Sequence, residues 1–206
     1  MAARCPRCAL HLDLCLCAEV SPLAVETRVV VVQHGKESNR TSNSGRLVPI
    51  ALRGGELRLR GAPGVSFCGD DLHEAARRTV LLYPLPGTPI LAPDGRPVTL
   101  LVPDGNWAQA RKLVQREPAL LAAERAALPP GPPSNYRLRT HPDPSRVSTF
   151  EAIARALGVL EGPAVQAHLE RVFAIFVERT LYRRGDLPAA EVTGGLPGRR
   201  RGPPSQ

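Results

Sequence analysis

The stretch LLVPDGNWAQARKL, residues 100–113, predicts a strand that ends in a turn and is followed by a helix. Its three leading apolar residues are typical of a buried strand, and Pro-Asp-Gly at 103–105 ends that strand. Either Asp104 or Asn106 could cap the following helix. Open α/β sheets commonly hold ligands at the carboxyl end of a core strand. The junction is therefore a candidate site, although Trp107, the only tryptophan, could equally fill the core.

Apolar runs and helical patterns alternate along the rest of the chain. Strand-like runs occur at residues 25–34, 56–61, 79–84 and 98–103. The first is continuous and β-branched, as expected of a strand buried on both faces. Apolar residues at helical spacing predict helices over 148–160 and 163–184. This alternation predicts an α/β fold in which helices flank a mostly parallel sheet.

The composition favours one globular domain with small appendages. A chain of 206 residues with 43% hydrophobic residues can bury a substantial core. We find no apolar run of about 18 residues that could cross a membrane, and no signal-peptide pattern. We therefore expect a soluble, cytoplasmic protein with no membrane association and no stable protein partner. We expect a cysteine-rich knuckle (1–20), a main domain (21–188) and a disordered basic tail (189–206).

The charge of the chain is strongly positive. Lysine and arginine number 27 against 19 acidic residues, which gives a net charge of +8, and only Lys36 and Lys112 are lysines. A GC-rich genome alone produces such an arginine excess. A basic domain nevertheless favours a polyanionic partner, because phosphate binding releases counterions. We therefore expect contact with a nucleic acid.

Four cysteines near the N-terminus have the spacing of a metal site. Cys5 and Cys8 form a C-x2-C pair, and Cys15 and Cys17 follow as C-x-C. Four thiolates so close in sequence can surround one tetrahedral zinc, which would be structural because no position remains for water. The alternatives are disulfides or four unrelated thiols. Cys68 lies outside this cluster, and we expect it to be a small buried hydrophobe.

Two further segments are candidates for function. The loop at 34–47 crowds polar residues directly behind a buried strand, where loops often carry function, although a solvated polar loop is the commoner case. In the segment at 147–152, Ser148 and Glu151 form a capping box in front of an apolar helix, which by itself says nothing about function.

Taken together, these segments resemble the DTW-domain family of tRNA-uridine aminocarboxypropyltransferases. The resemblance covers residues 5–180 and rests on six separated motifs in the same order. These are the cysteine knuckle, H-x-x-E-x-x-R-x-x-N-x-G-R-L (34–47), L-L-Y-P (81–84), D-G-N-W-A-Q-A-R-K (104–112), P-S-N-Y-R-L-R (133–139) and S-T-F-E-A (148–152). One departure is Asn106, where the family usually has threonine; this leaves fine substrate preference more open than the reaction.

The resemblance implies a SPOUT-like catalytic domain with a C-terminal knot that holds S-adenosylmethionine. Uracil N3 of a tRNA would attack the γ-carbon of the methionine moiety and release methylthioadenosine. Asp104 would be the general base, or instead a contact of the donor. The residues expected to bind S-adenosylmethionine are Tyr83, Pro84, Pro103, Gly105, Trp107, Ser148, Thr149 and Glu151.

Further residues are expected to bind the substrates. Arg40 or Arg46 would hold the donor carboxylate, and Glu37 or Asp104 its ammonium. Tyr136 would stack on the base. The full set is Glu37, Arg40, Asn43, Arg46, Arg111, Lys112, Tyr136, Arg137 and Arg139. Four of these cations would contact phosphates, namely Arg111, Lys112, Arg137 and Arg139. The rival interpretations are a SPOUT-type RNA methyltransferase and a non-catalytic zinc-ribbon module that binds RNA.

Overall fold

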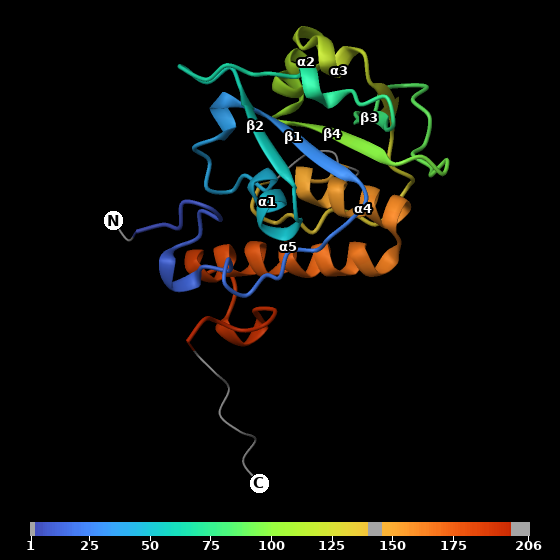
Figure 1. Cartoon of the computed structure of the whole chain (residues 1–206). Coiled ribbons are helices and arrows are strands. Elements are labelled where there is room, and N and C mark those ends of the chain that lie inside the picture. The colour runs from blue at the N-terminus through green and yellow to red at the C-terminus, as the bar shows by residue number, and fades with distance from the viewer. Residues whose placement is uncertain (1–2, 140–145, 199–206) are drawn as a thin grey trace.

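The computed structural model describes residues 3–139 and 146–198, and this part of the chain contains a five-stranded sheet (Figure 1). The strands are β1 (Arg28–His34), β2 (Glu56–Arg60), β3 (Arg78–Leu82), β4 (Val98–Asp104) and β5 (Glu124–Ala126). Their spatial order is β2-β1-β4-β3-β5, and each neighbouring pair is parallel. The predicted α/β fold with a parallel sheet is confirmed, and four of its strands were expected.

Helices cover both faces of the sheet. The helices are α1 (Val48–Ala51), α2 (Trp107–Arg116), α3 (Pro118–Leu121), α4 (Thr149–Glu161) and α5 (Pro163–Arg184). Helices α1, α4 and α5 lie on one side of the sheet, and α2 and α3 lie on the other (Figure 1). The two predicted C-terminal helices are therefore confirmed to within one residue at each end.

The central strand β1 explains why the sheet needs two helical layers. Val29 and Val31 pack into the core that contains α4 and α5, whereas Val30 and Val32 pack into the core beneath α2. All four are buried. A strand with apolar side chains on both faces is stable only when both faces are covered.

Capping residues fix the starts of the two helices nearest the site. Asn106 caps α2 and forms a capping box with Gln109, so Asn106 rather than Asp104 is the cap. Ser148 caps α4 in the predicted box with Glu151. Both helices thus begin where the local sequence indicates.

The two ends of the described chain pack against α5. Cysteines of the knuckle share the core that includes α5. Residues 189–198, for which the composition predicts a disordered tail, instead include a turn of 3-10 helix at Ala189–Glu191 and the buried Val192. The rest of that expected tail, 199–206, lies outside the described residues.

Two smaller observations complete the fold. Cys68 is exposed, so the expectation that it is buried was wrong; it lies in the loop between β2 and β3 rather than in either core. Within the described ranges, we find no helix with both the length and the apolar character needed to cross a membrane.

Candidate active site and metal centre

The site lies where the chain connections diverge at the carboxyl ends of β1 and β4. These strands are neighbours, with Gln33 paired to Asp104 in the register. The connection after β1 runs through α1 on one face, and the connection after β4 runs through α2 on the other (Figure 1). Such a divergence opens a crevice beyond the strand ends, which is where open α/β sheets bind ligands.

Asp104 is the buried charge at this crevice. Its Oδ2 accepts hydrogen bonds from Gln33 Nε2 at 2.8 Å and from Asn43 Nδ2 at 2.6 Å. Its Oδ1 accepts one from Thr149 Oγ1 at 2.5 Å. A carboxylate offers about four acceptor positions, so one position on Oδ1 remains for a ligand. Three segments far apart in sequence therefore meet at one carboxylate.

Glu37 is a second buried carboxylate at the crevice. Its side chain is 2% exposed and pairs with Arg40 and with Arg139, each at 3.1 Å. Arg139 Nε also donates to Ser42 Oγ at 3.0 Å. The loop after β1 and the proline-rich segment after β5 are thereby joined by charge-assisted hydrogen bonds.

Two cavities open beside Asp104. The first, with a volume of about 700 Å³, lies at the ends of β3, β4 and β5, and we call it the β3-side cavity. The second, of about 620 Å³, lies beside the loop after β1 and is called the β1-side cavity. Both volumes are in the range of small-molecule sites. The residues that line both cavities are Gly105, Trp107, Arg146, Val147 and Thr149.

Most of the predicted donor-binding residues line these cavities. Tyr83, Pro84 and Pro103 line the β3-side cavity, and Ser148 lines the β1-side cavity. Asp104, Glu37, Asn43, Tyr136 and Arg139 also line the β1-side cavity. The strand-end turn that carries Trp107 and the start of α4 thus converge on one hollow region, as the sequence predicted.

Trp107 is a wall of this region rather than core filling. Its side chain is 40% exposed. Its ring centre lies 5.8 Å from that of Tyr83, and the Arg146 guanidinium lies 4.5 Å from the indole centre. Such a cation–π contact holds the indole at the junction of the two cavities.

Glu151 secures the proline-rich segment instead of facing the two cavities. Its carboxylate accepts hydrogen bonds from Ser134 Oγ and Asn135 N, both at 2.7 Å, and from Ser148 N at 2.8 Å. It lines a third cavity, of about 510 Å³, beside α5. Its local role as a capping residue therefore also fixes the backbone that borders the β1-side cavity.

Several predicted substrate contacts lie away from the two cavities. Arg46 turns back into its own loop, where Nη2 donates to the carbonyls of Ser38 and Arg40 at 3.1 Å. Arg137 lines the third cavity and lies 3.9 Å from Glu178. Arg40, Arg111 and Lys112 are exposed outside both cavities.

Tyr136 is held by its neighbours. Its hydroxyl donates to the carbonyl of Ser42, and its ring centre lies 5.8 Å from that of Phe173. Burial raises the pKa of its hydroxyl. The ring borders the β1-side cavity but also packs into the main core.

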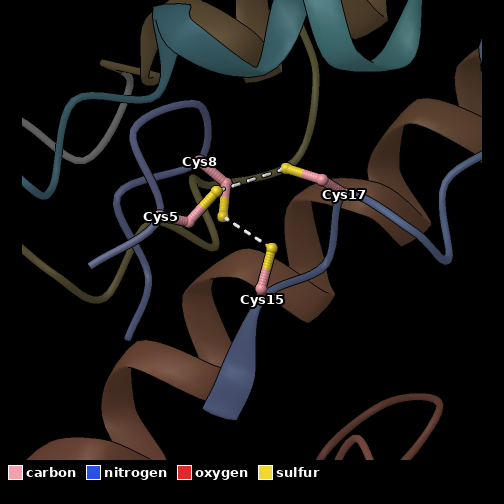
Figure 2. A group of neighbouring side chains, drawn as sticks. All are labelled: Cys5, Cys8, Cys15 and Cys17. Carbon is pink, nitrogen blue, oxygen red and sulfur yellow. Dashed lines mark hydrogen bonds between the residues drawn. The ribbon is translucent and has the colours of Figure 1, made fainter. Parts of the chain in front are cut away.

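The four knuckle cysteines come together as expected (Figure 2). Their sulfur atoms all lie within 4.8 Å of one another. The Cys5–Cys17 and Cys8–Cys15 sulfur pairs are each 3.8 Å apart. A Zn–S distance of about 2.3 Å in a tetrahedral site gives sulfur separations of about 3.8 Å. The cluster therefore fits a closed, four-thiolate zinc site.

The pKa values of the thiols differ within the cluster. Although burial acts to raise it, backbone N–H groups of Cys8 and Arg7 lower the pKa of the Cys5 thiol to about 7. Burial raises the pKa of Cys17, and the neighbouring Cys8 adds to that effect. A bound cation would relieve the repulsion among the thiolates, since zinc binds the deprotonated form.

Arg179 ties α5 to the knuckle. This guanidinium is fully buried. It donates two hydrogen bonds to the Glu19 carboxylate, at 2.9 and 2.6 Å, and others to the carbonyls of Leu14, Cys15 and Gly195. One of these carbonyls belongs to a cysteine of the cluster, so Arg179 holds the backbone of the cysteine cluster.

Sequence reasoning did not single out Arg146 or Gln33, and it included Ser44 only as a member of the candidate loop at 34–47. Arg146 borders both cavities, Ser44 Oγ accepts from Phe150 N at 3.3 Å, and Gln33 supports Asp104. Arg146 lies directly before the 147–152 segment and Gln33 directly before the 34–47 loop. Their proximity to those segments was the only available signal.

Comparison with known proteins agrees with the sequence motifs. The sequence model of the DTW domain matches residues 2–181. The chain belongs to the DTW domain family. It is 30% identical over 169 residues to tRNA-uridine aminocarboxypropyltransferase 2 of Drosophila melanogaster. The matched region covers 77% of this chain and 66% of that protein.

Two mammalian proteins are also similar to this DTW domain. The tRNA-uridine aminocarboxypropyltransferase 2 proteins of Macaca fascicularis and Mus musculus are 26% and 27% identical to it, over 76% of this chain and 56% of their own length. The chain thus spans between about half and two thirds of these relatives. No solved structure matches it.

Proposed function

We propose that this DTW domain transfers the 3-amino-3-carboxypropyl group of S-adenosylmethionine to uracil N3 in tRNA. The family and the names of the similar proteins support the reaction class. The observation that carries the proposal is the pair of cavities that share the Gly105–Trp107 turn and the start of α4. A bent donor with an apolar and a charged end needs two such adjoining spaces.

The two cavities differ in the chemistry they offer to this donor. The β3-side cavity presents aromatic and proline side chains, including Tyr83 and Trp107, which suit the adenosyl group. The β1-side cavity presents the carboxylates of Glu37 and Asp104 beside Arg139. These groups suit the ammonium and carboxylate of the methionine moiety, with Arg146 as a further cation at the junction.

In the proposed reaction, the N3 lone pair forms a bond to the γ-carbon while the γ-carbon–sulfur bond breaks. The bonding pair goes to sulfur, the sulfonium becomes a neutral thioether, and methylthioadenosine leaves. The N3 proton must also depart. We assign its removal to Asp104, whose one open acceptor position on Oδ1 could receive it. Since all three carbons on the sulfonium are electrophilic, positioning determines which one reacts.

The knuckle supports this site as a structural zinc centre, with Cys5, Cys8, Cys15 and Cys17 as ligands. A SPOUT-like C-terminal knot and a cytoplasmic location belong to the same proposal.

The test is to incubate the protein with unmodified tRNA and S-adenosylmethionine and to analyse nucleosides and by-products by mass spectrometry. Methylthioadenosine and an aminocarboxypropyl uridine support the proposal, whereas S-adenosylhomocysteine identifies the rival methyltransferase. Asp104→Asn should abolish most activity, and Asp94→Asn, at an exposed turn before β4, should not. RNA binding without any binding of S-adenosylmethionine by calorimetry would indicate the non-catalytic module.

A further inference from the structure

Charge is distributed unequally between the two edges of the sheet. Near the amino-terminal edge, four arginines pair with nearby carboxylates. Arg28 pairs with Glu56, Asp71 and Glu74 at 2.6 to 2.9 Å. The other pairs of this edge include Arg58 with Asp71, Arg78 with Glu124 and Arg96 with Asp94. These cations are therefore poorly suited to attract a polyanion.

The carboxyl-terminal edge presents cations that have no carboxylate partner among the residues described. Lys36 follows β1 directly, and Arg111 and Lys112 lie on α2; all three are exposed. Arg111 is one helical turn beyond Trp107, so both lie on one side of α2. These residues lie on elements that leave the same edge of the sheet as the candidate crevice.

His34 lies among these cations. Burial lowers its pKa; Lys36, Lys112 and Arg60 act in the same direction, and Glu37 opposes them. Its Nδ1 accepts a hydrogen bond from the backbone N–H of Lys36 at 3.2 Å. This contact assigns the hydrogen of the neutral ring to Nε2, which is then a donor for a ligand oxygen.

The cationic edge is continuous with the mouth of the candidate site. A Cβ placed on Gly105 would lie 3.5 Å from His34 Cβ, so the turn before α2 packs against His34. Gly105 and the 40% exposed Trp107 line both cavities. An RNA strand bound along the carboxyl-terminal edge would reach the crevice without crossing the amino-terminal edge of the sheet.

We propose that Lys36, His34, Arg111 and Lys112 form a docking surface for RNA phosphates that flank the target nucleotide. The inference rests on the proposed function, for which it names the face of the protein that meets tRNA. Exposed lysines and a neutral imidazole N–H suit phosphate oxygens, and such contacts position an RNA without reading its sequence. Arg137 does not belong to this surface, because it lines the third cavity.

The test compares two double variants with equal charge loss. Lys36→Gln with Lys112→Gln removes two cations from the surface; Arg53→Gln with Arg96→Gln removes two exposed cations that precede β2 and β4 at the opposite edge. The affinity for tRNA is measured by fluorescence anisotropy over a series of salt concentrations. Binding of S-adenosylmethionine is measured in parallel by calorimetry.

Loss of two phosphate contacts should lower the slope of log affinity against log salt by about 1.4 to 1.8. At about 0.1 M salt, this corresponds to an affinity loss of about 25- to 60-fold. The control pair should change affinity by less than about threefold, and neither pair should alter donor binding. Equal losses in both pairs, or an unchanged slope in the first, would overturn the docking surface.

The two proposals fail in different ways. If the unaltered protein modifies tRNA but the Lys36→Gln, Lys112→Gln double variant binds tRNA with the same affinity, the docking surface is wrong and the proposed function stands. If tRNA binding depends on the lysine pair but no group is transferred from S-adenosylmethionine, the reaction is wrong and the surface stands.

Discussion

Replacing Arg179 by methionine should destabilise the whole fold through the knuckle. The guanidinium is fully buried and donates to the Glu19 carboxylate and to three backbone carbonyls. Removing one partner of a buried ion pair costs about 3–5 kcal/mol. Because the Glu19 side chain is 39% exposed and can regain water, we expect the lower end, about 3 kcal/mol. Methionine preserves much of the apolar stem, so packing changes little.

The free energy of unfolding is measured by denaturant titration of the zinc-loaded protein. Arg183→Met, at an exposed position one turn further along α5, is the matched control and should change stability by less than about 0.5 kcal/mol. Arg179→Lys keeps the charge but loses the paired geometry, and should give an intermediate loss. A loss below about 1 kcal/mol for the methionine variant would refute the reasoning, since the ion pair and the hydrogen bonds to the three carbonyls would then contribute little to stability.

Three other predictions follow from single observations. A Cβ at Gly45 would lie 2.9 Å from Asp104 Oδ2, so Gly45→Ala should cost about 1–3 kcal/mol in thermal denaturation and weaken donor binding in calorimetry; unchanged binding would contradict this. Stripping zinc with a chelator should lower both the melting temperature and donor affinity, because the knuckle shares the core beneath the loop after β1; a metal-free protein with unaltered melting would exclude a structural centre. Hydrogen bonds from Arg58 and then Arg28 hold the pKa of Asp71 below its usual value. The contribution of Asp71 to the free energy of unfolding is therefore present above the ordinary aspartate pKa of about 3.9 and is lost as the pH falls below that value. The melting temperature of Asp71→Asn should therefore fall less steeply with decreasing pH than that of the unaltered protein.

Local sequence patterns predicted those strands and helices that burial pattern and capping residues determine within a few residues. The continuous apolar runs of β1 and β4 require burial on both faces, and Ser148 with Glu151 satisfies two of the orphan N–H groups at the start of α4 within four residues. By contrast, β5 has only three residues, Glu124–Ala126, without an apolar run. It exists because its backbone pairs with β3, a contact that no local pattern encodes.

The fate of single cations was the least predictable part of the site. Arg46 lies in the crowded loop and was, with Arg40, one of two candidates to bind the donor carboxylate, yet its guanidinium donates to carbonyls of that loop. No sequence pattern indicated a role for Arg146, although its guanidinium lies over the Trp107 ring and the residue borders both cavities. A long side chain can reach in many directions, and only the tertiary fold decides which acceptors surround it.

The cysteine cluster and the crevice are linked by more than a shared core. Burial lowers the pKa of Arg46, whereas the nearby charges of Cys8, Asp104 and Cys5 raise it. The same residue donates its backbone N–H to Asn43 Oδ1 at 3.3 Å, and Asn43 in turn donates to Asp104. One cation therefore lies within the electrostatic reach of both the thiol cluster and the carboxylate. Because the residues after Asn43 share a core with the knuckle, ordering of the cysteines by a metal would favour the observed geometry of Asp104, which the proposed reaction uses.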